Sequence, residues 1–245
     1  MAFDGITVAA VVQELEHTLV GGRISKIAQP ENDELLLTIK GNEGQKRLYI
    51  SASASLPLIY LTNENKPSPM TAPGFCMLLR KHLVGARITG ISQPDFERML
   101  LLDLDGRDEL GTPVKKQLIV EMLGRQSNVI LVSADGHIID CMRRVDSSMS
   151  ETRQVQPGLF YRLPPAPDKL DPMALDGEGL RRALDNPTGR EADKLLLDTF
   201  NGLSPLIARE LAFRAGGDGE PLARELEKLL DAVRREDFAP YLLVR

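Results

Sequence analysis

The chain has 245 residues, 42% of them hydrophobic, which is typical of a globular protein with one large or two smaller domains. Its net charge of −5 argues against a protein that coats nucleic acid over its whole surface, and its two cysteines exclude a disulfide scaffold. No apolar run approaches the ~18 residues of a membrane span, and no secretion leader is present, so we expect a cytoplasmic protein without membrane attachment.

An internal repeat organises the first half of the chain. Residues 19–30 and 83–94 are identical at eight of twelve positions, with a spacing of 64 residues. Each copy follows an amphipathic pattern, which predicts helices over residues 7–20 and 73–84, each stopped by glycine. Duplication of a structural unit explains this repeat without any functional role.

Each copy continues into strand signals that are separated by short polar turns. The expected strands cover residues 23–29, 34–40, 47–52, 87–93, 98–104 and 116–122, and a further hairpin covers 127–145. The predicted fold class is therefore α+β. Internally duplicated α-β-β-β units would form a β-sandwich-like domain, with two sheets face to face and helices outside.

The remaining third of the chain changes character. Residues 163–176 contain four prolines and are expected to form an extended linker along Pro164, Pro165 and Pro167. Helical periodicity without strand signals then covers residues 179–182, 191–200, 204–215 and 221–235. We therefore expect two domains, residues 1–175 and 176–245, within a chain that is part of a longer protein.

Positive charge gathers in two stretches of this acidic chain. Residues 65–100 carry a net charge of +3, and residues 141–163 carry +2. Solvated faces often produce such fluctuations, but guanidinium forks also match phosphate oxygens. The candidate phosphate ligands are Arg80, Lys81, Arg143 and Arg144.

Two polar segments interrupt the strand pattern, and the first is the turn at residues 95–98. Its Glu97–Arg98 pair is either a solvated ion pair or a group that reads a base edge or a phosphate. Phe96 beside it is one of few aromatic residues that could stack on a base. The corresponding turn of the first copy, residues 31–34, lacks the arginine.

The second polar segment covers residues 121–128, between two apolar strands. It offers carboxylate, guanidinium, amide and hydroxyl groups, and Gly124 allows close approach of a ligand. In the structural alternative, Ser127 and Asn128 only satisfy turn amides, while Arg125 pairs with Glu121.

A third candidate lies between two predicted helices of the C-terminal third. Ser204 can cap the second helix and Gly202 precedes it, which leaves amides for a phosphate as in a helix–hairpin–helix. Simple helix packing explains the same residues equally well. Buried packing is also the default for Cys76 and Cys141, and no spacing indicates a nucleophile set or a glycine-rich phosphate loop.

Several motifs in order resemble the NFACT family, which includes bacterial RqcH, labelled fibronectin-binding protein A-like, and eukaryotic NEMF. They are DGI at 4–6, the repeated GGRI element, PGFCMLLRKHL at 73–83, Glu97–Arg98, EMLGRQSNVIL at 121–131 and RQVQPGLFY at 153–161. The resemblance covers the whole chain. It implies an NFACT-N domain, similar to the N-terminal domain of formamidopyrimidine-DNA glycosylases, and a helix–hairpin–helix module, with a coiled coil and an NFACT-R domain to follow.

The resemblance also implies a role in ribosome-associated quality control. Such proteins bind the large ribosomal subunit with peptidyl-tRNA and recruit tRNA, alanine tRNA in bacteria, for template-free C-terminal alanine tailing. Peptide transfer is then ribosomal, so the chain is expected to be no enzyme and to need no cofactor or metal. The implied tRNA-binding residues are Glu97, Arg98, Glu121, Met122, Leu123, Gly124 and Arg125.

This sequence departs from the family pattern at two of those positions. The usual pair is Asp-Arg, so Glu97 moves its carboxylate by about one methylene. Leu123 stands where methionine is common. The departure at Glu97 bears on the exact contacts and on the choice of tRNA, whereas the second motif keeps its Glu, Gly and Arg.

Two rival functions follow from the same resemblance. Glycosylases of the related fold use an N-terminal proline amine followed by glutamate, whereas Ala2 and Phe3 follow Met1 here, and the usual four-cysteine finger is absent. A fibronectin-binding adhesin, which the older label implies, conflicts with the missing secretion signal. We therefore do not expect glycosylase chemistry. The alternative functions are a DNA-binding, glycosylase-like protein without catalytic residues and a fibronectin-binding adhesin.

Overall fold

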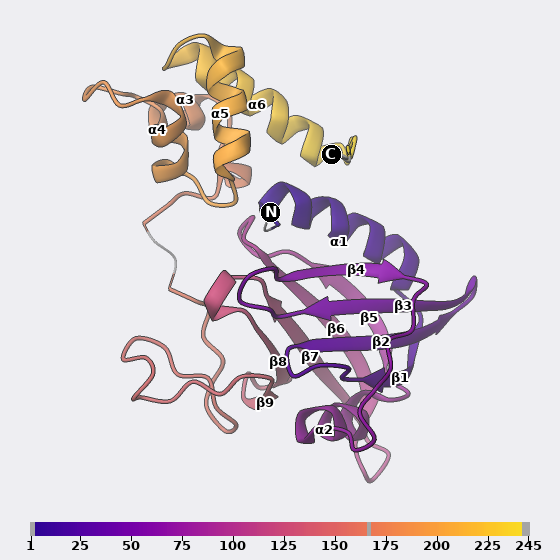
Figure 1. Ribbon diagram of the computed structural model, residues 1–245. Coiled ribbons are helices and arrows are strands. Elements are labelled where there is room, and N and C mark those ends of the chain that lie inside the picture. Colours follow the sequence, from indigo (N-terminus) through magenta and orange to yellow (C-terminus); the bar gives the residue numbers. More distant parts are fainter. Residues whose placement is uncertain (1–2, 166–167, 242–245) are drawn as a thin grey trace. The chain divides into compact units, whose positions relative to one another are not determined.

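The computed structural model describes residues 3–165 and 168–241, which form two compact units (Figure 1). The sheet unit contains Glu14–Pro94 and Arg98–Pro165. The helical unit contains the described residues from 168 onward together with Asp4–Gln13 and Asp95–Glu97. The boundary between the two units therefore does not fall at a single position in the sequence. No helix of the described residues is both long enough and apolar enough to cross a membrane.

Nine antiparallel strands form one hydrogen-bonded sheet in the order β4-β3-β2-β1-β5-β6-β7-β8-β9. The strands are β1 (Arg23–Ala28), β2 (Glu34–Gly41), β3 (Gly44–Ser51), β4 (Leu58–Thr62), β5 (Arg87–Ser92), β6 (Met99–Arg107), β7 (Pro113–Glu121), β8 (Asn128–Ser133) and β9 (Ile138–Cys141). Five consecutive residues of β2, Leu35–Ile39, are buried, as are Asn128–Val132 of β8, so neighbouring structure covers both faces of these strands.

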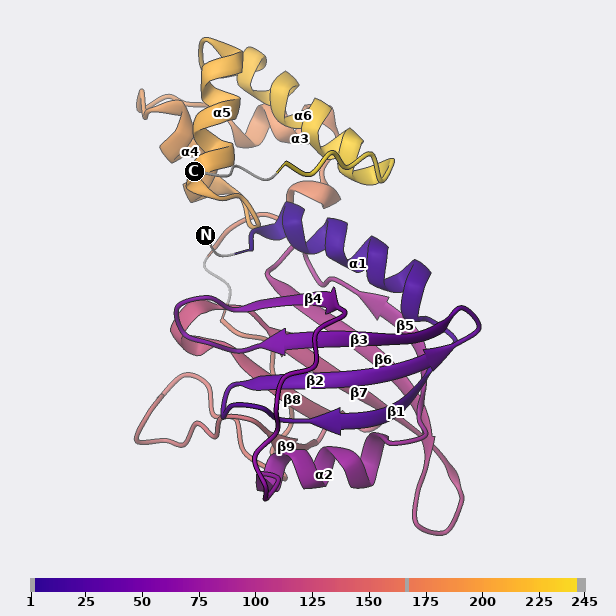
Figure 2. The same cartoon turned by 45° about the vertical axis from the view of Figure 1, so that its right-hand side comes forward.

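The expectation of two separate sheets is wrong, because β1 and β5 join the two halves of the sheet. The joint is short: the ladder pairs Arg23 with Arg87. Figures 1 and 2 both draw β2 and β3 in front of β6 and β7. Helix α2 (Gly74–Leu83) packs against β1, β6 and β9, although four strands lie between β1 and β9 in the hydrogen-bonded order. The sheet therefore curves so that its two halves form layers.

The two copies of the repeat meet at this joint and bond to each other reciprocally. Gly21 N donates to Ile88 O at 2.8 Å, and the equivalent Gly85 N donates to Ile24 O, also at 2.8 Å. Ile24 N and Ile88 N complete the set by donating to Ala86 O and Gly22 O at 3.0 and 2.9 Å. Gly21 and Gly85 share a φ of 88°, which an L-residue with a Cβ rarely adopts. The duplicated sequence therefore builds a pseudo-symmetric centre.

The helical unit contains α3 (Gly177–Ala183), α4 (Ala192–Thr199), α5 (Pro205–Ala215) and α6 (Glu220–Arg234), preceded by a 3₁₀ turn η2 (Pro172–Ala174). Its buried core consists mainly of leucines from these helices, and Phe96 belongs to it. The first residues of α1 (Gly5–Leu19) are also part of the unit, with Ile6 and Ala9 packed against the core. The prediction of a helical C-terminal region is confirmed. The predicted linker includes residues 166 and 167, which lie outside the described residues.

Candidate nucleic-acid interface

The structure brings two of the predicted segments together at one end of neighbouring strands. Strand β7 ends at Glu121, which pairs in register with Met99 at the start of β6. One residue further out, Met122 N donates to Arg98 O at 2.9 Å. Arg98 and the segment that follows β7 are therefore adjacent, although more than twenty positions separate them in sequence.

The turn that precedes β6 is conformationally unusual. Asp95 and Phe96 both have positive φ values, 49° and 56°, which are costly for residues with a Cβ. Phe96 is 4% exposed within the helical core and is therefore unavailable for base stacking, contrary to its candidacy in the sequence. Glu97 and Arg98 are half-buried. The Arg98 side chain makes no hydrogen bond or ion pair with any described residue.

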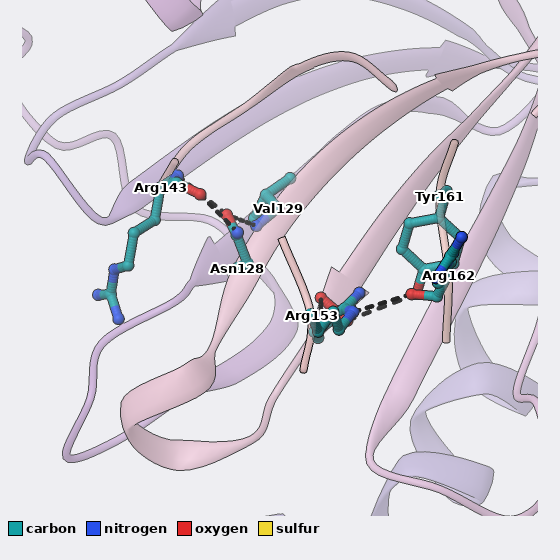
Figure 3. A network of polar contacts seen from close by, with 7 residues as sticks. Asn128, Val129, Arg143, Arg153, Tyr161 and Arg162 are labelled. Carbon is teal, nitrogen blue, oxygen red and sulfur yellow. Dashed lines mark hydrogen bonds and ion pairs between the residues drawn. The ribbon is translucent and has the colours of Figure 1, made fainter. Parts of the chain in front are cut away.

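Glu121 is fully buried and forms an ion pair with Arg153 rather than with Arg125. Figure 3 shows Arg153 beside Tyr161, whose hydroxyl lies 3.4 Å from Glu121 Oε2. Burial raises the pKa of the Glu121 carboxyl, while the hydrogen bonds and charge of Arg153 oppose that rise. The pairing of Arg125 with Glu121, considered as the structural alternative, is therefore wrong. Because both Glu121 and Met122 are buried, their side chains support the segment from within.

The segment after β7 turns through a short 3₁₀ helix, η1 (Gly124–Gln126). Gly124 has a φ of 61°, so the turn requires the left-handed conformation that glycine adopts readily. Leu123 and Gly124 are half-buried, whereas Arg125 is exposed, and its guanidinium has no partner among the described residues. The carbonyl of Arg125 accepts a hydrogen bond from Arg143 Nη1 at 2.6 Å.

Asn128 holds Arg143 in place beside η1. Its amide nitrogen donates to Arg143 O at 2.8 Å, and its amide oxygen accepts from Arg143 N at 2.9 Å (Figure 3). Asn128 is 3% exposed, so its amide side chain holds the half-buried Arg143 backbone from within the protein. A chain of contacts therefore runs from the buried amide through Arg143 to the backbone of Arg125.

A pocket of about 500 Å³ lies beside η1. It is lined by Glu31, Asn32, Asp33, Ala52, Ser127, Met142 and Arg143. The Ser127 hydroxyl is fully buried and has no hydrogen-bond partner in the protein. The pocket thus combines carboxylates with a guanidinium, a mixture of acceptors and donors that suits a polar ligand.

The other candidate cations already have protein partners. Arg80 Nε donates to Ile27 O at 2.8 Å. Lys81 forms an exposed ion pair with Glu109 at 2.6 Å, and Arg144 lies 3.5 Å from Asp140. The Lys81–Glu109 pair is exposed and therefore weak, whereas Asp140 beside Arg144 is buried. No observation singles these three cations out as phosphate ligands.

Gly202 and Ser204 have structural roles in the helical unit. The Ser204 hydroxyl accepts from Ile207 N at 3.3 Å and caps α5, as its sequence context predicts. Gly202 has a φ of 77°, its carbonyl accepts from Gly5 N at 2.8 Å, and a Cβ there would collide with Phe96. The loop is therefore packed within the protein at Gly202, which leaves its use as a phosphate site unsupported there.

Both cysteines are buried with free thiols. Burial raises the pKa of the Cys76 thiol, and burial together with the charge of Asp140 raises the pKa of Cys141 to about 12. Within residues 3–165 and 168–241, no group of three or more His, Cys, Asp or Glu side chains is arranged to hold a metal ion.

In the sequence, Arg153 lies in the basic stretch 141–163 and begins the RQVQPGLFY motif, but neither pattern identifies it as the partner of Glu121. The pair joins positions 32 residues apart. A chemical signal could have identified this pair. A carboxylate that becomes buried at the end of an apolar strand is stabilised by a cation that is buried with it.

Comparisons with known proteins agree with this architecture. The family model for the NFACT N-terminal and middle domains matches residues 4–245. The Rqc2 homolog RqcH of Bacillus subtilis is 36% identical over 242 residues, which are 98% of this chain and 42% of that protein. Ribosome quality control complex subunit 2 of Saccharomyces cerevisiae is 30% identical over 146 residues, 59% of this chain and 13% of that protein.

A solved structure matches the fold as well. The N-terminal part of the fibronectin/fibrinogen-binding protein from Streptococcus suis superposes with a TM-score of 0.84 at 33% identity, covering 94% of this chain and 84% of that chain. The chain spans less than half the length of the two curated relatives named above. The match of the family model over nearly every residue shows that the chain belongs to the NFACT family.

Proposed function

We propose that the chain is the tRNA-binding part of a ribosome-associated quality control factor. Two observations carry this proposal: the backbone of Arg98 pairs with Met122, just before η1, and the exposed Arg125 guanidinium of η1 has no protein partner among the described residues. Guanidinium groups bind phosphate oxygens with paired hydrogen bonds and also read base edges. Relatives named for ribosome quality control give the likeness from which the partner is inferred.

The buried residues of the interface fit a supporting role. The Glu121–Arg153 pair and the Asn128–Arg143 contacts hold the residues on either side of η1 in place. A loop that is already ordered loses less conformational entropy when it binds RNA, so Arg125 is presented at lower free-energy cost. Direct contacts are therefore expected from Arg98, Leu123, Gly124 and Arg125, and from Glu97, which precedes Arg98 in the sequence.

In this proposal the chain makes and breaks no covalent bond. It positions an alanine tRNA on a cytoplasmic large ribosomal subunit that carries peptidyl-tRNA, and the ribosome transfers the peptide during C-terminal alanine tailing. Such a role requires no cofactor or metal from the chain.

Binding of an alanine tRNA transcript by the Arg98→Ala and Arg125→Ala variants tests the proposal. Each variant should bind about 1–3 kcal/mol more weakly than the wild type at matched salt. Arg214→Ala is the control, because it removes the same charge from the exposed surface of α5. Unchanged binding by both interface variants, or an equal loss in the control, contradicts the proposed site.

The structural relative from Streptococcus suis is named for binding fibronectin and fibrinogen. No feature of the described residues favours those ligands over RNA. Binding of the wild-type chain to immobilised fibronectin at physiological salt, unaffected by Arg125→Ala, would support adhesion instead.

A further inference from the structure

A second pocket, of about 290 Å³, lies on strands β1, β2 and β3. It is lined by Ser25, Lys26, Thr38, Lys40, Gln45, Arg47 and Asn65, so three cations and no carboxylate surround it. The strand register explains this convergence. Thr38 lies opposite Lys26 on one side and Arg47 on the other, and residues two apart on a strand share a face.

The three cations are available to a ligand. None of them forms an ion pair with a described residue, and Arg47 Nη1 makes one contact, to Asn63 O at 3.0 Å. Lys26 and Lys40 are exposed, and Arg47 is half-exposed. Three cationic side chains that line one pocket without a carboxylate repel one another. An anion bound among them would reduce that repulsion.

The second copy of the repeat supplies an internal comparison. In each copy a bulge residue donates its hydroxyl to the neighbouring strand: Ser25 Oγ to Thr38 O at 3.2 Å, and Thr89 Oγ1 to Asp103 O at 3.3 Å. Thr38 and Asp103 are therefore equivalent positions.

The same registers identify the counterparts of the three cations. Lys26 corresponds to Gly90, because these residues face Thr38 and Asp103 respectively. Lys40 corresponds to Asp105, since they lie opposite Arg23 and Arg87. Arg47 corresponds to Gln117, which donates to Asp103 Oδ1 at 2.8 Å.

The same backbone thus carries three cations in one copy, and a glycine, an aspartate and a glutamine in the other. The fold does not require the cations, because the second copy builds its ladder without them. Composition does not explain them either, because residues 1–64, which contain all three, have a net charge of −3. Binding of an anionic ligand is a physical reason for the cluster that neither the fold nor the composition supplies.

We propose that Lys26, Lys40 and Arg47 bind the phosphodiester backbone of RNA as a contact additional to the η1 interface. The inference rests on the proposed function for the identity of the partner. The pocket chemistry favours phosphate over a base: lysine and arginine donate to phosphate oxygens, and no aromatic side chain lines the pocket for stacking.

The test compares the wild-type chain with the triple variant Lys26→Gln, Lys40→Gln and Arg47→Gln. Binding of an alanine tRNA transcript, of an oligouridine of about 30 nucleotides and of polyglutamate is measured over a range of salt concentrations. The matched control is Arg181→Gln, Arg214→Gln and Arg224→Gln, which removes the same charge from exposed ion pairs of the helical unit. Thermal unfolding checks that each variant is folded.

Each phosphate contact contributes about 0.7–0.9 to the slope of log affinity against log salt. The triple variant should therefore lose about 2 from the slope and at least about tenfold in affinity at low salt, whereas the control should keep most of both. Slopes equal to those of the wild type overturn the inference, as does an equal loss in the control. Loss of polyglutamate binding with RNA binding unchanged also overturns it, in favour of an acidic protein partner.

The same measurements separate this inference from the proposed tRNA site. If the triple variant matches the wild type while Arg125→Ala weakens tRNA binding, the pocket fails and the site stands. If Arg98→Ala and Arg125→Ala change nothing while the triple variant loses its salt slope on oligouridine, the tRNA site fails and the pocket stands.

Discussion

Arg153 donates two parallel hydrogen bonds to Glu121, from Nη1 to Oε1 at 3.0 Å and from Nη2 to Oε2 at 2.8 Å. The Arg153 side chain is 12% exposed, and that of Glu121 is not exposed at all. Arg153 Nε also donates to Arg162 O at 2.9 Å, so the pair connects residues 153–162 to the end of β7. The carboxylate is therefore part of the support under η1.

Replacement of Arg153 by methionine should destabilise the chain strongly at neutral pH. It would leave a buried carboxylate without a charged partner, which typically costs about 3–5 kcal/mol of unfolding free energy. Arg153 lowers the pKa of Glu121 against the effect of burial, so the pKa should rise further in Arg153→Met. The native state then binds a proton more tightly than the unfolded state, and the unfolding free energy of the variant should increase as pH falls from about 8 to 5.

Urea unfolding at several pH values measures this effect. The control is the double variant Glu121→Leu with Arg153→Met, which should recover much of the lost stability, because a well-packed apolar pair replaces the ionic one. If the loss of unfolding free energy in Arg153→Met does not change with pH, the Glu121 carboxyl carries no unpaired charge in the folded variant, which contradicts the prediction.

Local pattern was sufficient to predict most elements of this fold. The two helices before the repeats and eight of the nine strands follow from periodicity and turn residues, within a few residues at their ends. Strand β4 was missed because its five residues, Leu58–Thr62, lie in a stretch rich in proline and asparagine and are too short to show alternation. Its assignment depends on pairing with β3, which is a non-local contact.

The joint between the two halves could not be predicted, because it depends on how the copies meet. Periodicity identifies strands but not their neighbours, and reciprocal bonds such as Gly21 N to Ile88 O involve main-chain atoms alone. The same limit applies to Phe96. Its place in the helical core rather than on an RNA surface depends on the positive φ values of Asp95 and Phe96, which sequence does not indicate.

The sequence identifies the polar residues of the candidate interface, but it does not indicate which of them are buried. The segment 121–128 stood out because it carries polar groups between apolar strands, and Arg125 is indeed exposed. Glu121 and Asn128 are buried because tertiary partners, Arg153 and the backbone of Arg143, satisfy them. Such partners are distant in sequence, so polar composition alone cannot separate ligands from supports.

Gly202→Ala should destabilise the helical unit by about 2–5 kcal/mol, the sum of left-handed strain and overpacking. A Cβ at this position would collide with the carbonyl and ring of Phe96, at a φ of 77°. Gly216→Ala is the matched control: its φ is 63°, but nothing lies within 4 Å of the added Cβ. Chemical denaturation should show a clearly smaller loss for Gly216→Ala, and equal losses would mean that the packing around Gly202 contributes nothing.

The thiol of Cys141 should be inert in the native protein. Burial raises its pKa to about 12, so only about one molecule in ten thousand carries the reactive thiolate at pH 8. Ellman's reagent should modify neither Cys76 nor Cys141 until denaturant is added, when both should react. Cys141→Ala distinguishes the two thiols, and rapid labelling of one cysteine in the folded Cys141→Ala protein would show that Cys76 is accessible.

Arg143 should assist RNA binding by positioning η1 rather than by contacting phosphate. Its Nη1 donates to the carbonyl of Arg125, a bond that Arg125→Ala leaves in place and Arg143→Met removes. If Arg143 acts through the loop, the double variant should bind tRNA about as weakly as Arg125→Ala alone, because the guanidinium being positioned is already gone. Independent phosphate contacts would instead give losses that add to within about 0.5 kcal/mol. Equilibrium binding of the four proteins at matched salt measures the coupling, and additive losses would assign Arg143 a direct contact with RNA.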